Sequence, residues 1–215
     1  MSGRGTPEVR PPLVAGRRAL LALLLVVGLL AAGCGSSEKS TSAEETTTSE
    51  VTTSGEVVEG TGYSYELPEG WTEADDQVDI EQIGSTDTFI TADELRGDLA
   101  VNVNVFREEN IPESVNVDQF TKLGLDRVTS APESVGLPAG TTVEVASGPE
   151  SSSLAGEDAT DTTLRTDLGS ATLLQRQIST LHDGVAYTIT LTSDEDGLEE
   201  DSATLDALLA SWSWG

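Results

Sequence analysis

Residues 171–192 read ATLLQRQISTLHDGVAYTITLT and contain the clearest fold signal in the chain. The run 171–181 has the length of a long strand, and residues 185–192 alternate strictly between apolar and polar side chains, as half-buried strands do. Between the two runs lies Asp183-Gly184, a pair that favours a type I′ turn because both turn residues need positive φ. The stretch therefore predicts an antiparallel β-hairpin.

Further strands are predicted on both sides of this hairpin. Residues 99–105 alternate strictly, and weaker strand patterns lie at residues 63–67, 141–147 and 160–166. Strands of this kind, joined by hairpins and accompanied by two helices, predict a mostly antiparallel α+β domain. We place this domain at residues 61–215, since a chain of 215 residues suits one domain with additional segments.

The two helices are predicted at residues 117–128 and 197–210. Asn116, followed three residues later by Gln119, forms a capping-box pattern at the start of the first helix. The second helix carries an apolar face at helical spacing, formed by Leu198, Leu205, Leu208, Leu209 and Trp212. Acidic residues crowd its start, where negative charge interacts favourably with the helix dipole.

The N-terminus has the pattern of a secretory signal peptide, which we assign to residues 1–33. Arginines precede an apolar run, Ala19–Ala32, and small residues follow it. A transmembrane helix needs about 20 apolar residues, so this shorter run favours a cleaved signal. The pair Arg17-Arg18 is compatible with twin-arginine export as well as with the general secretory route, and the sequence leaves both open.

The end of the apolar run, Leu30-Ala-Ala-Gly-Cys34, resembles a bacterial lipobox. The resemblance implies lipid transfer to the Cys34 sulfur, cleavage between Gly33 and Cys34, and acylation of the new amino terminus. Two or three acyl chains would anchor a protein stably where one would not. We therefore expect the chain to be attached to the outer face of the bacterial cytoplasmic membrane through the lipid, with its domain extracytoplasmic. The alternative is an ordinary secreted protein with a free cysteine.

Residues 34–60 predict a disordered tether that begins at the lipidated Cys34. The segment is rich in Ser, Thr and Glu and has almost no large apolar residue from which to build a core.

The whole chain has 11 Lys+Arg against 38 Asp+Glu, a formal net charge of −27. Such a chain repels phosphate backbones, so nucleic acid is excluded as a partner.

The sequence contains few residues suited to catalysis or metal binding. The single His excludes the usual multi-His metal sites, and the single Cys excludes an intrachain disulfide. A Ser/His/Asp triad would have to use His182, which we expect to be exposed beside the predicted turn. We therefore expect no catalytic residue, no metal and no cofactor.

The acidic stretch Asp194–Gly197 imitates part of an EF-hand loop. With Gly197 as the sixth position, the first and twelfth positions fall on Thr192 and Ala203, so both essential carboxylates are missing. A solvated helix start is the favoured interpretation, and weak association with divalent cations is the alternative.

Three motifs in a fixed order carry a family resemblance: GYSYELPEGW at residues 62–71, LAGEDA at 154–159 and DALLASWSW at 206–214. The chain from about residue 61 resembles the PsbP-like (Mog-type) fold, and in particular the actinobacterial lipoproteins of the LpqN/LpqT kind. The resemblance implies an antiparallel sheet flanked by helices and a non-enzymatic accessory or binding role. It transfers no functional residue, and Trp71, Gly156 and Trp212 look structural. Residues 73–94 match nothing in the family.

Together these patterns predict a lipid-anchored, cell-surface accessory or binding lipoprotein without catalytic activity. Its partner would be another protein or an envelope component. Two alternatives remain: an envelope hydrolase that uses His182, and an acidic surface protein that associates with cations.

Overall fold

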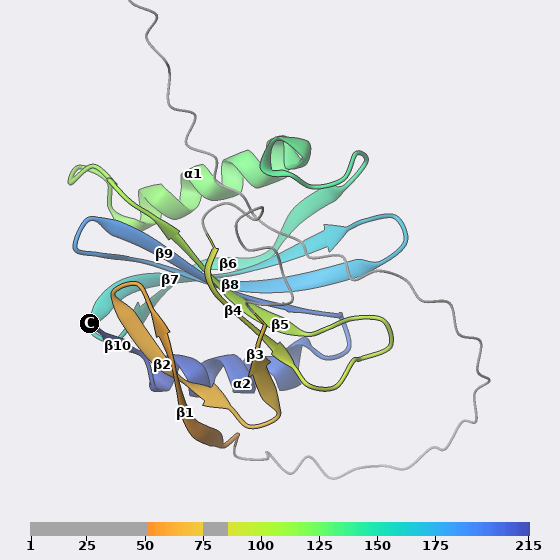
Figure 1. Cartoon of the computed structure of the whole chain (residues 1–215). Helices are drawn as coiled ribbons and strands as arrows, with labels where there is room; N and C mark the ends of the chain where they lie inside the picture. The colour runs from red at the N-terminus through yellow and green to blue at the C-terminus, as the bar shows by residue number, and fades with distance from the viewer. Residues whose placement is uncertain (1–50, 75–85) are drawn as a thin grey trace, which may run out of the picture.

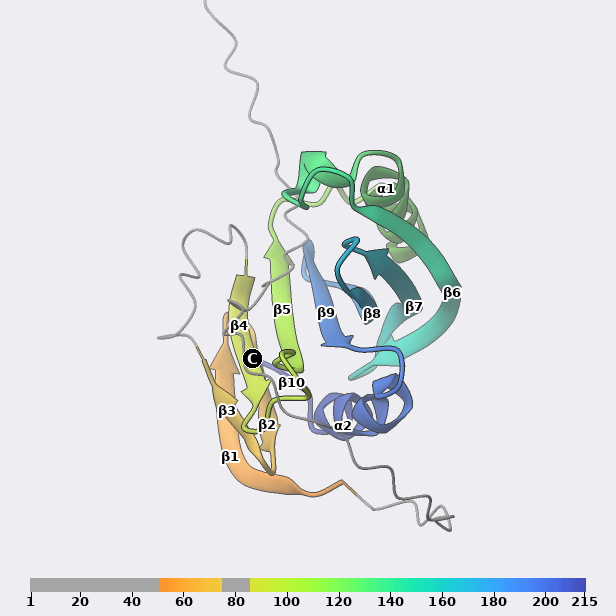
Figure 2. The same ribbon diagram turned by 90° about the vertical axis from the view of Figure 1, so that its right-hand side faces the viewer.

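The structure is a computed structural model that describes residues 51–74 and 86–215. In these residues the strands form two antiparallel sheets (Figures 1 and 2). The small sheet has the order β1-β2-β10 and contains Thr53–Gly60 (β1), Tyr63–Pro68 (β2) and Ser213–Trp214 (β10). The predicted mostly antiparallel α+β fold is confirmed.

The large sheet has seven strands in the order β3-β4-β5-β9-β8-β7-β6. Their bounds are Trp71–Glu73 (β3), Thr86–Ala92 (β4), Asn102–Glu108 (β5), Val185–Ser193 (β9), Thr172–His182 (β8), Glu157–Asp167 (β7) and Thr142–Leu154 (β6). Helix α1 (Val117–Ser130) lies on one face of this sheet, followed by the short 3-10 helix η2 (Pro132–Val135). Helix α2 (Leu198–Ala210) and the small sheet lie on the other face (Figure 1).

The main hydrophobic core lies between the large sheet, the small sheet and α2. Trp212 is 5% exposed, and its ring stacks on Tyr63 with the ring centroids 4.3 Å apart. Trp71 is half-buried and packs against the same core. The fully buried residues of this core include Val58, Tyr65, Ile90, Val105, Ile178, Ile189, Leu191, Leu205 and Leu208. The predicted core position of Trp212 is therefore confirmed.

The opposite face of the large sheet, beneath α1, is unusually polar. Cross-strand pairing aligns Asn104, Thr190, Gln177 and Thr162 in one row across β5, β9, β8 and β7, which we call the polar row. All four side chains are buried. A second, smaller apolar cluster joins the C-terminal part of α1 to η2, β6 and β7. Helix α1 therefore covers a sheet face that is apolar at one end and polar in its middle.

The local signals in the sequence correspond closely to observed elements. The hairpin turn is at Asp183-Gly184, with φ of 49° and 76°. Helix α1 has both hydrogen bonds of the capping box between Asn116 and Gln119. Gly156 lies in the β6–β7 turn with φ of 91°, as expected for a turn residue.

The predicted tether ends too late in the chain. Residues 53–60, which we assigned to the disordered segment, form strand β1 and pair with β2. Backbone pairing and one buried apolar side chain, Val58 at 1% exposure, fix this strand despite its Ser, Thr and Glu content. The signal peptide, Cys34 and residues 34–50 of the tether lie outside the described residues.

Residues 73–94, which resembled nothing in the family, contain the end of β3 and all of β4. Strand β4 fills the sheet between β3 and β5. Residues 75–85 of this stretch lie outside the described part of the chain.

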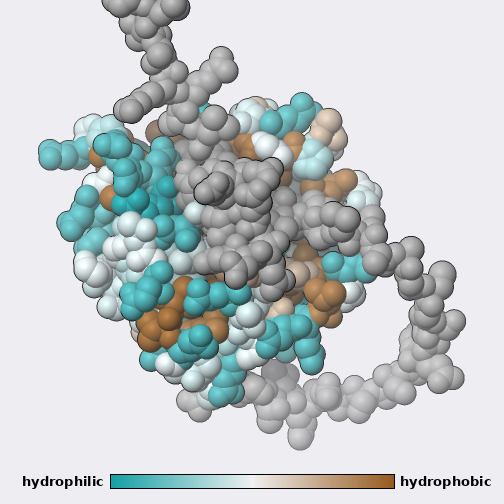
Figure 3. All heavy atoms as spheres, viewed as in Figure 1, coloured by the Kyte–Doolittle hydropathy of each residue, from teal (hydrophilic) through white to brown (hydrophobic). Residues whose placement is uncertain are grey.

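Exposed large apolar side chains are scattered over the described surface. They lie in four separate parts of the fold, and they are Val57 of β1, Leu95 of the β4–β5 loop, Leu123 of α1 and Val145 of β6. Figure 3 shows mainly hydrophilic and intermediate surface on this side, with apolar atoms in small separate groups. Single surface apolar residues are ordinary, so these side chains do not mark a binding surface. Among the described residues, no helix has the length and apolar character needed to cross a membrane.

Candidate functional site

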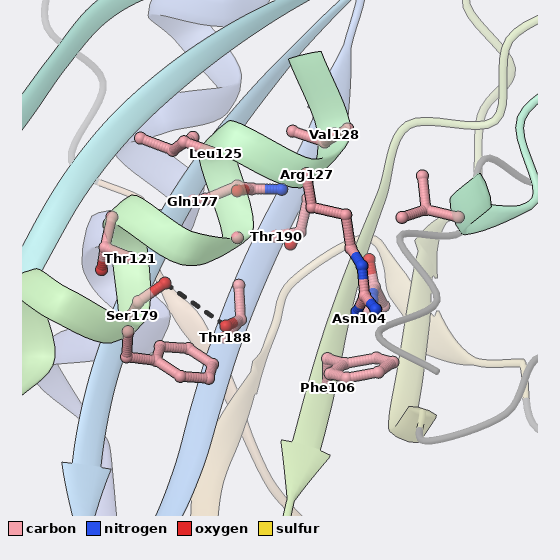
Figure 4. Close-up of a pocket in the computed structure, with 13 residues that line it drawn as sticks. Asn104, Phe106, Thr121, Leu125, Arg127, Val128, Gln177, Ser179, Thr188 and Thr190 are labelled. Carbon is pink, nitrogen blue, oxygen red and sulfur yellow. Dashed lines mark hydrogen bonds between the residues drawn. The ribbon is translucent and has the colours of Figure 1, made fainter. Parts of the chain in front are cut away.

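A pocket lies between α1 and the polar middle of the large sheet, and we call it the α1 pocket (Figure 4). Strands β5, β8 and β9 provide its floor, and α1 with η2 provides its roof. The residues that line it are Asn104, Phe106, Phe120, Thr121, Gly124, Leu125, Arg127, Val128, Val135, Gln177, Ser179, Thr188 and Thr190. The floor is therefore rich in hydroxyl and amide groups, while the roof is mostly apolar.

Gly124 contributes to the pocket, because this position of α1 has no side chain above the sheet. Gly124 lies in the middle of the helix, and a Cβ atom built on it would meet no heavy atom within 4 Å. Glycine inside a helix costs about 1 kcal/mol relative to alanine. The helix thus carries a locally unfavourable residue at the place where it borders the hollow.

Gln177 is the most unusual residue of the floor. Its side chain is 8% exposed, and its Nε2 atom has no hydrogen-bond partner. Thr162, its cross-strand neighbour in the polar row, also has an unpartnered buried hydroxyl, although Thr162 does not line the pocket. A buried polar group without a partner costs about 1–3 kcal/mol, so such groups are rare in native proteins.

The neighbouring rows of the same sheet face are hydrogen-bonded. On one side, Ser179 bonds Thr188 at 3.3 Å, and Thr160 bonds Thr121 of α1 at 2.7 Å. On the other side, the Gln175 amide donates to Thr192 at 3.3 Å. The unpartnered amide of Gln177 therefore lies between two rows whose polar side chains are hydrogen-bonded, and it belongs to the pocket lining.

The space in the pocket is small, about 50 Å³. On this scale one water molecule requires about 10–15 Å³. The pocket can hold a few water molecules or one compact ligand group of comparable size. A large ligand could enter it only in part.

Charged groups lie on the side of the pocket formed by β5 and the end of α1. In Figure 4 the Arg127 side chain extends from α1 towards Asn104 and Phe106. Nearby on β5, the Glu108 Oε2 atom is buried and has no hydrogen-bond partner. Burial raises the pKa of the Glu108 carboxyl above its ordinary value, and the positive charge of Arg127 partly opposes this rise.

His182 is not the exposed turn residue that we expected. Its side chain is 21% exposed, and its ring stacks on Trp214 at a centroid distance of 4.3 Å. Nδ1 lies 2.9 Å from Glu157 Oε1, and Nε2 lies 3.6 Å from Asp183 Oδ2. Both ring nitrogens thus face carboxylates, whereas a serine triad needs one of them to face the nucleophile. This geometry favours a structural role that joins the C-terminal segment to the β8–β9 hairpin.

The acidic start of α2 is not simply solvated. Asp201 is buried and receives two hydrogen bonds from the Arg96 guanidinium, at 2.6 Å and 2.9 Å. Ser193 donates a third hydrogen bond to the same carboxylate, and Asp194 lies 3.4 Å from Arg96. The guanidinium therefore already pairs with two carboxylates at the start of α2. Among the described residues, no three His, Cys, Asp or Glu side chains form a group suited to a metal ion.

The sequence did not reveal the α1 pocket or the Arg96–Asp201 pair. Arg96 lies in a loop far from α2 in the sequence, so no local pattern connects the two. Asp201 carries a signal that could have been used: it follows Leu198 by three residues and precedes Leu205 by four, which places it on the apolar face of α2. A carboxylate at such a position requires a partner.

Comparisons with known proteins identify the fold. No protein-family model and no curated protein matches the sequence. Among solved structures, cyanobacterial PsbP (CyanoP) from Synechocystis superposes with a TM-score of 0.54 at 17% identity, covering 81% of this chain and 98% of that one. LpqN of Mycobacterium tuberculosis, described as involved in cell envelope biogenesis, gives a TM-score of 0.47 at 9% identity over 76% of this chain and 88% of that one. The superposition on CyanoP shows that the fold is PsbP-like, and at 17% identity the similarity concerns the fold alone.

Proposed function

We propose that the chain is a lipid-anchored, extracytoplasmic binding protein without catalytic activity, and that the α1 pocket is its binding site. One observation carries the binding role: the buried Gln177 amide, which faces the pocket without a hydrogen-bond partner. A buried polar group without a partner requires an explanation, and Gln177 is the residue for which a pocket beside it supplies one: a ligand in the pocket would complete the hydrogen bond.

The chemistry of the pocket lining supports binding over catalysis. The lining contains hydroxyl, amide and apolar side chains, and Arg127 is its charged member. General acid–base catalysis requires a group that can exchange a proton near the working pH, such as His, Glu or Asp. No such group lines the pocket, and the contacts of His182 with Trp214 and Glu157 account for that residue structurally.

The anchor is supported by the sequence. The signal-like segment and Leu30–Cys34 together have the order that lipid modification requires, with the chain's single thiol directly after the cleavage position. The first described residues, 51 and 52, lead directly into β1 at the edge of the small sheet. A lipid on Cys34 would then hold the domain near the membrane through residues 35–50.

The binding role can be tested by filling the pocket. Gly124→Leu places a side chain into the hollow, and Lys122→Leu is a matched control because Lys122 is exposed on the same helix. Each full-length protein is purified from its native membrane and denatured, and the released small molecules are identified by mass spectrometry. We expect the wild type and Lys122→Leu to release a common compound that Gly124→Leu lacks. Identical profiles for all three proteins would contradict the binding role.

The anchor can be tested separately through Cys34. We expect Cys34→Ala to abolish labelling by a fatty-acid probe and to leave unprocessed precursor, or to release the protein if another peptidase cleaves it. Labelling of the variant at the wild-type level would refute lipidation at this residue.

A further inference from the structure

We infer that the α1 pocket is selective for a compact, uncharged group that presents a carbonyl oxygen, such as a primary amide on a small ring. This inference rests on the proposed function, in which the pocket is the binding site, and it names the chemical class of the ligand. Three features of the pocket support it: the unpartnered donor on its floor, the electrostatic surroundings, and the size of the space.

The floor requires a hydrogen-bond acceptor. Gln177 Nε2 is a donor, and it is the buried polar atom of the pocket lining that lacks a partner among the described residues. A carbonyl oxygen from a ligand would satisfy this donor. An aliphatic group would leave the donor unpaired, so purely apolar ligands fit the floor poorly.

The electrostatic surroundings favour a neutral acceptor over a carboxylate. The chain has a formal net charge of −27, which repels anions at long range. Next to the pocket, burial raises the pKa of Glu108, which shows that this region already disfavours negative charge. Arg127 attracts anions, but it already interacts with the Glu108 carboxylate. A buried carboxylate facing a neutral amide donor would lose more hydration than it regains.

The space in the pocket can receive a compact polar group, and its apolar walls favour a ring attached to that group. The space of about 50 Å³ corresponds to a few water molecules. Phe106, Phe120 and Leu125 form apolar walls around it. Aromatic side chains pack favourably against a ligand ring, so the amide group would enter the space while the ring lies against these walls.

Saturation-transfer NMR with two small probes tests this inference on the full chain in lipid nanodiscs, with empty discs as background. Benzamide carries a neutral carbonyl group, and benzoate has nearly the same shape with a negative charge. We expect saturation transfer to benzamide, and binding of benzoate that is at least about tenfold weaker. Stronger binding of benzoate, or no binding of benzamide, would overturn the inference.

Two variants connect benzamide binding to the Gln177 donor. Gln177→Met keeps the length of the side chain and removes the N–H group, so we expect benzamide affinity to fall about tenfold. Thr162→Val is the matched control: it removes the other unpartnered group of the polar row, which does not line the pocket, and should leave affinity unchanged. Both variants should melt at or above the wild-type temperature, which shows that they fold. Equal benzamide affinity in the wild type and Gln177→Met would overturn the inference.

The two proposals fail in distinguishable ways. If a native compound is lost in Gly124→Leu but benzamide does not bind the wild type, the pocket binds a ligand of another class and only the inference fails. If Gly124→Leu changes no released compound and neither probe binds, the proposed function itself fails.

Discussion

Trp212 connects the C-terminus to the main core. Its ring stacks on Tyr63 and lies within 5.7 Å, centroid to centroid, of Tyr65, both from β2. Trp214 lies 5.5 Å away, edge to face, and stacks in turn on His182. Trp212 therefore holds the end of α2 against the small sheet. Trp214, in β10, packs against His182 of the large sheet. Trp212 does not form the exposed aromatic patch that a ligand-binding Trp pair would require.

We expect Trp212→Ala to lower the free energy of unfolding by about 3–5 kcal/mol, because it removes a buried aromatic ring and leaves a cavity. Trp71→Ala is the comparison, and its smaller effect follows from the half-buried position of Trp71. Urea unfolding monitored by circular dichroism measures both. Equal midpoints for the wild type and Trp212→Ala would show that the ring does not support the core.

Glu108 gives a prediction for pH dependence. Its pKa is raised above the ordinary value of 4.5, chiefly by burial, so the folded state disfavours the charged form. A carboxyl group with a raised pKa favours folding at low pH, and this contribution is lost as the pH rises through the folded-state pKa.

We therefore expect Glu108→Gln to raise the melting temperature by a few degrees at pH 7. The advantage should shrink as the pH falls and disappear well below pH 4.5, where Glu108 is protonated in both the folded and unfolded states. Thermal unfolding of both proteins across this range is the measurement. A constant difference at every pH would mean that the charge of Glu108 is not responsible.

At the level of single elements, α1 and strand β8 explain what the sequence could and could not predict. The capping box and the hairpin turn are local, and both were predicted from a few adjacent residues. Gln175, Gln177 and Ser179 are polar residues at every second position of β8, a pattern that indicates a solvent-facing side. Helix α1 covers the central part of that side. The polar face of β8 is buried by packing between distant segments, which no local pattern reports.

The same limit applies to β1 and to Asp201. Strand β1 has the composition of a tether, and its pairing with β2 depends on a neighbour that composition does not show. Asp201 lies in an acidic helix start, yet it is buried because Arg96, from a loop more than a hundred residues away, supplies the opposite charge. Each of these features is determined by contacts between residues far apart in the sequence.

Helix α1 should become more stable when Gly124 is replaced by alanine. The added Cβ meets no atom within 4 Å, and alanine favours a helix interior over glycine by about 1 kcal/mol. Chemical denaturation should show Gly124→Ala to be more stable by up to this amount. Gly197→Ala is the contrasting case, because a Cβ there would overlap the Arg96 guanidinium and disturb its bond to Asp201. A destabilising Gly124→Ala would indicate that the space above the sheet is not open.

At the scale of the whole molecule, the described chain is a seven-stranded sheet enclosed by two different layers. The layer made of α2 and the small sheet covers an apolar face and forms the main core. The α1 layer covers a polar face and leaves a pocket. The main core and the α1 pocket that we propose as the binding site thus lie on opposite sides of one sheet, so the α1 side can be changed without disturbing the main core.

The extent of the domain follows from this arrangement, because β1 belongs to the small sheet. A chain that starts at residue 61 lacks β1 and exposes the core region that Val58 covers. We expect its free energy of unfolding to be lower than that of a chain that starts at residue 51. The expected difference is about 1.5–3 kcal/mol or more, since burying one large apolar side chain usually contributes that amount. Urea unfolding of the two chains compares them directly. Equal stability would place β1 outside the folding unit.

The central claim is that the α1 pocket binds a ligand, and a crystal structure of the wild-type protein isolated from its own membrane tests it most directly. We predict electron density for a compact group between α1 and the sheet, with an acceptor atom within about 3.2 Å of Gln177 Nε2. The account would be contradicted if ordered water alone satisfied that amide, or if α1 closed onto the sheet and left no space above Gln177.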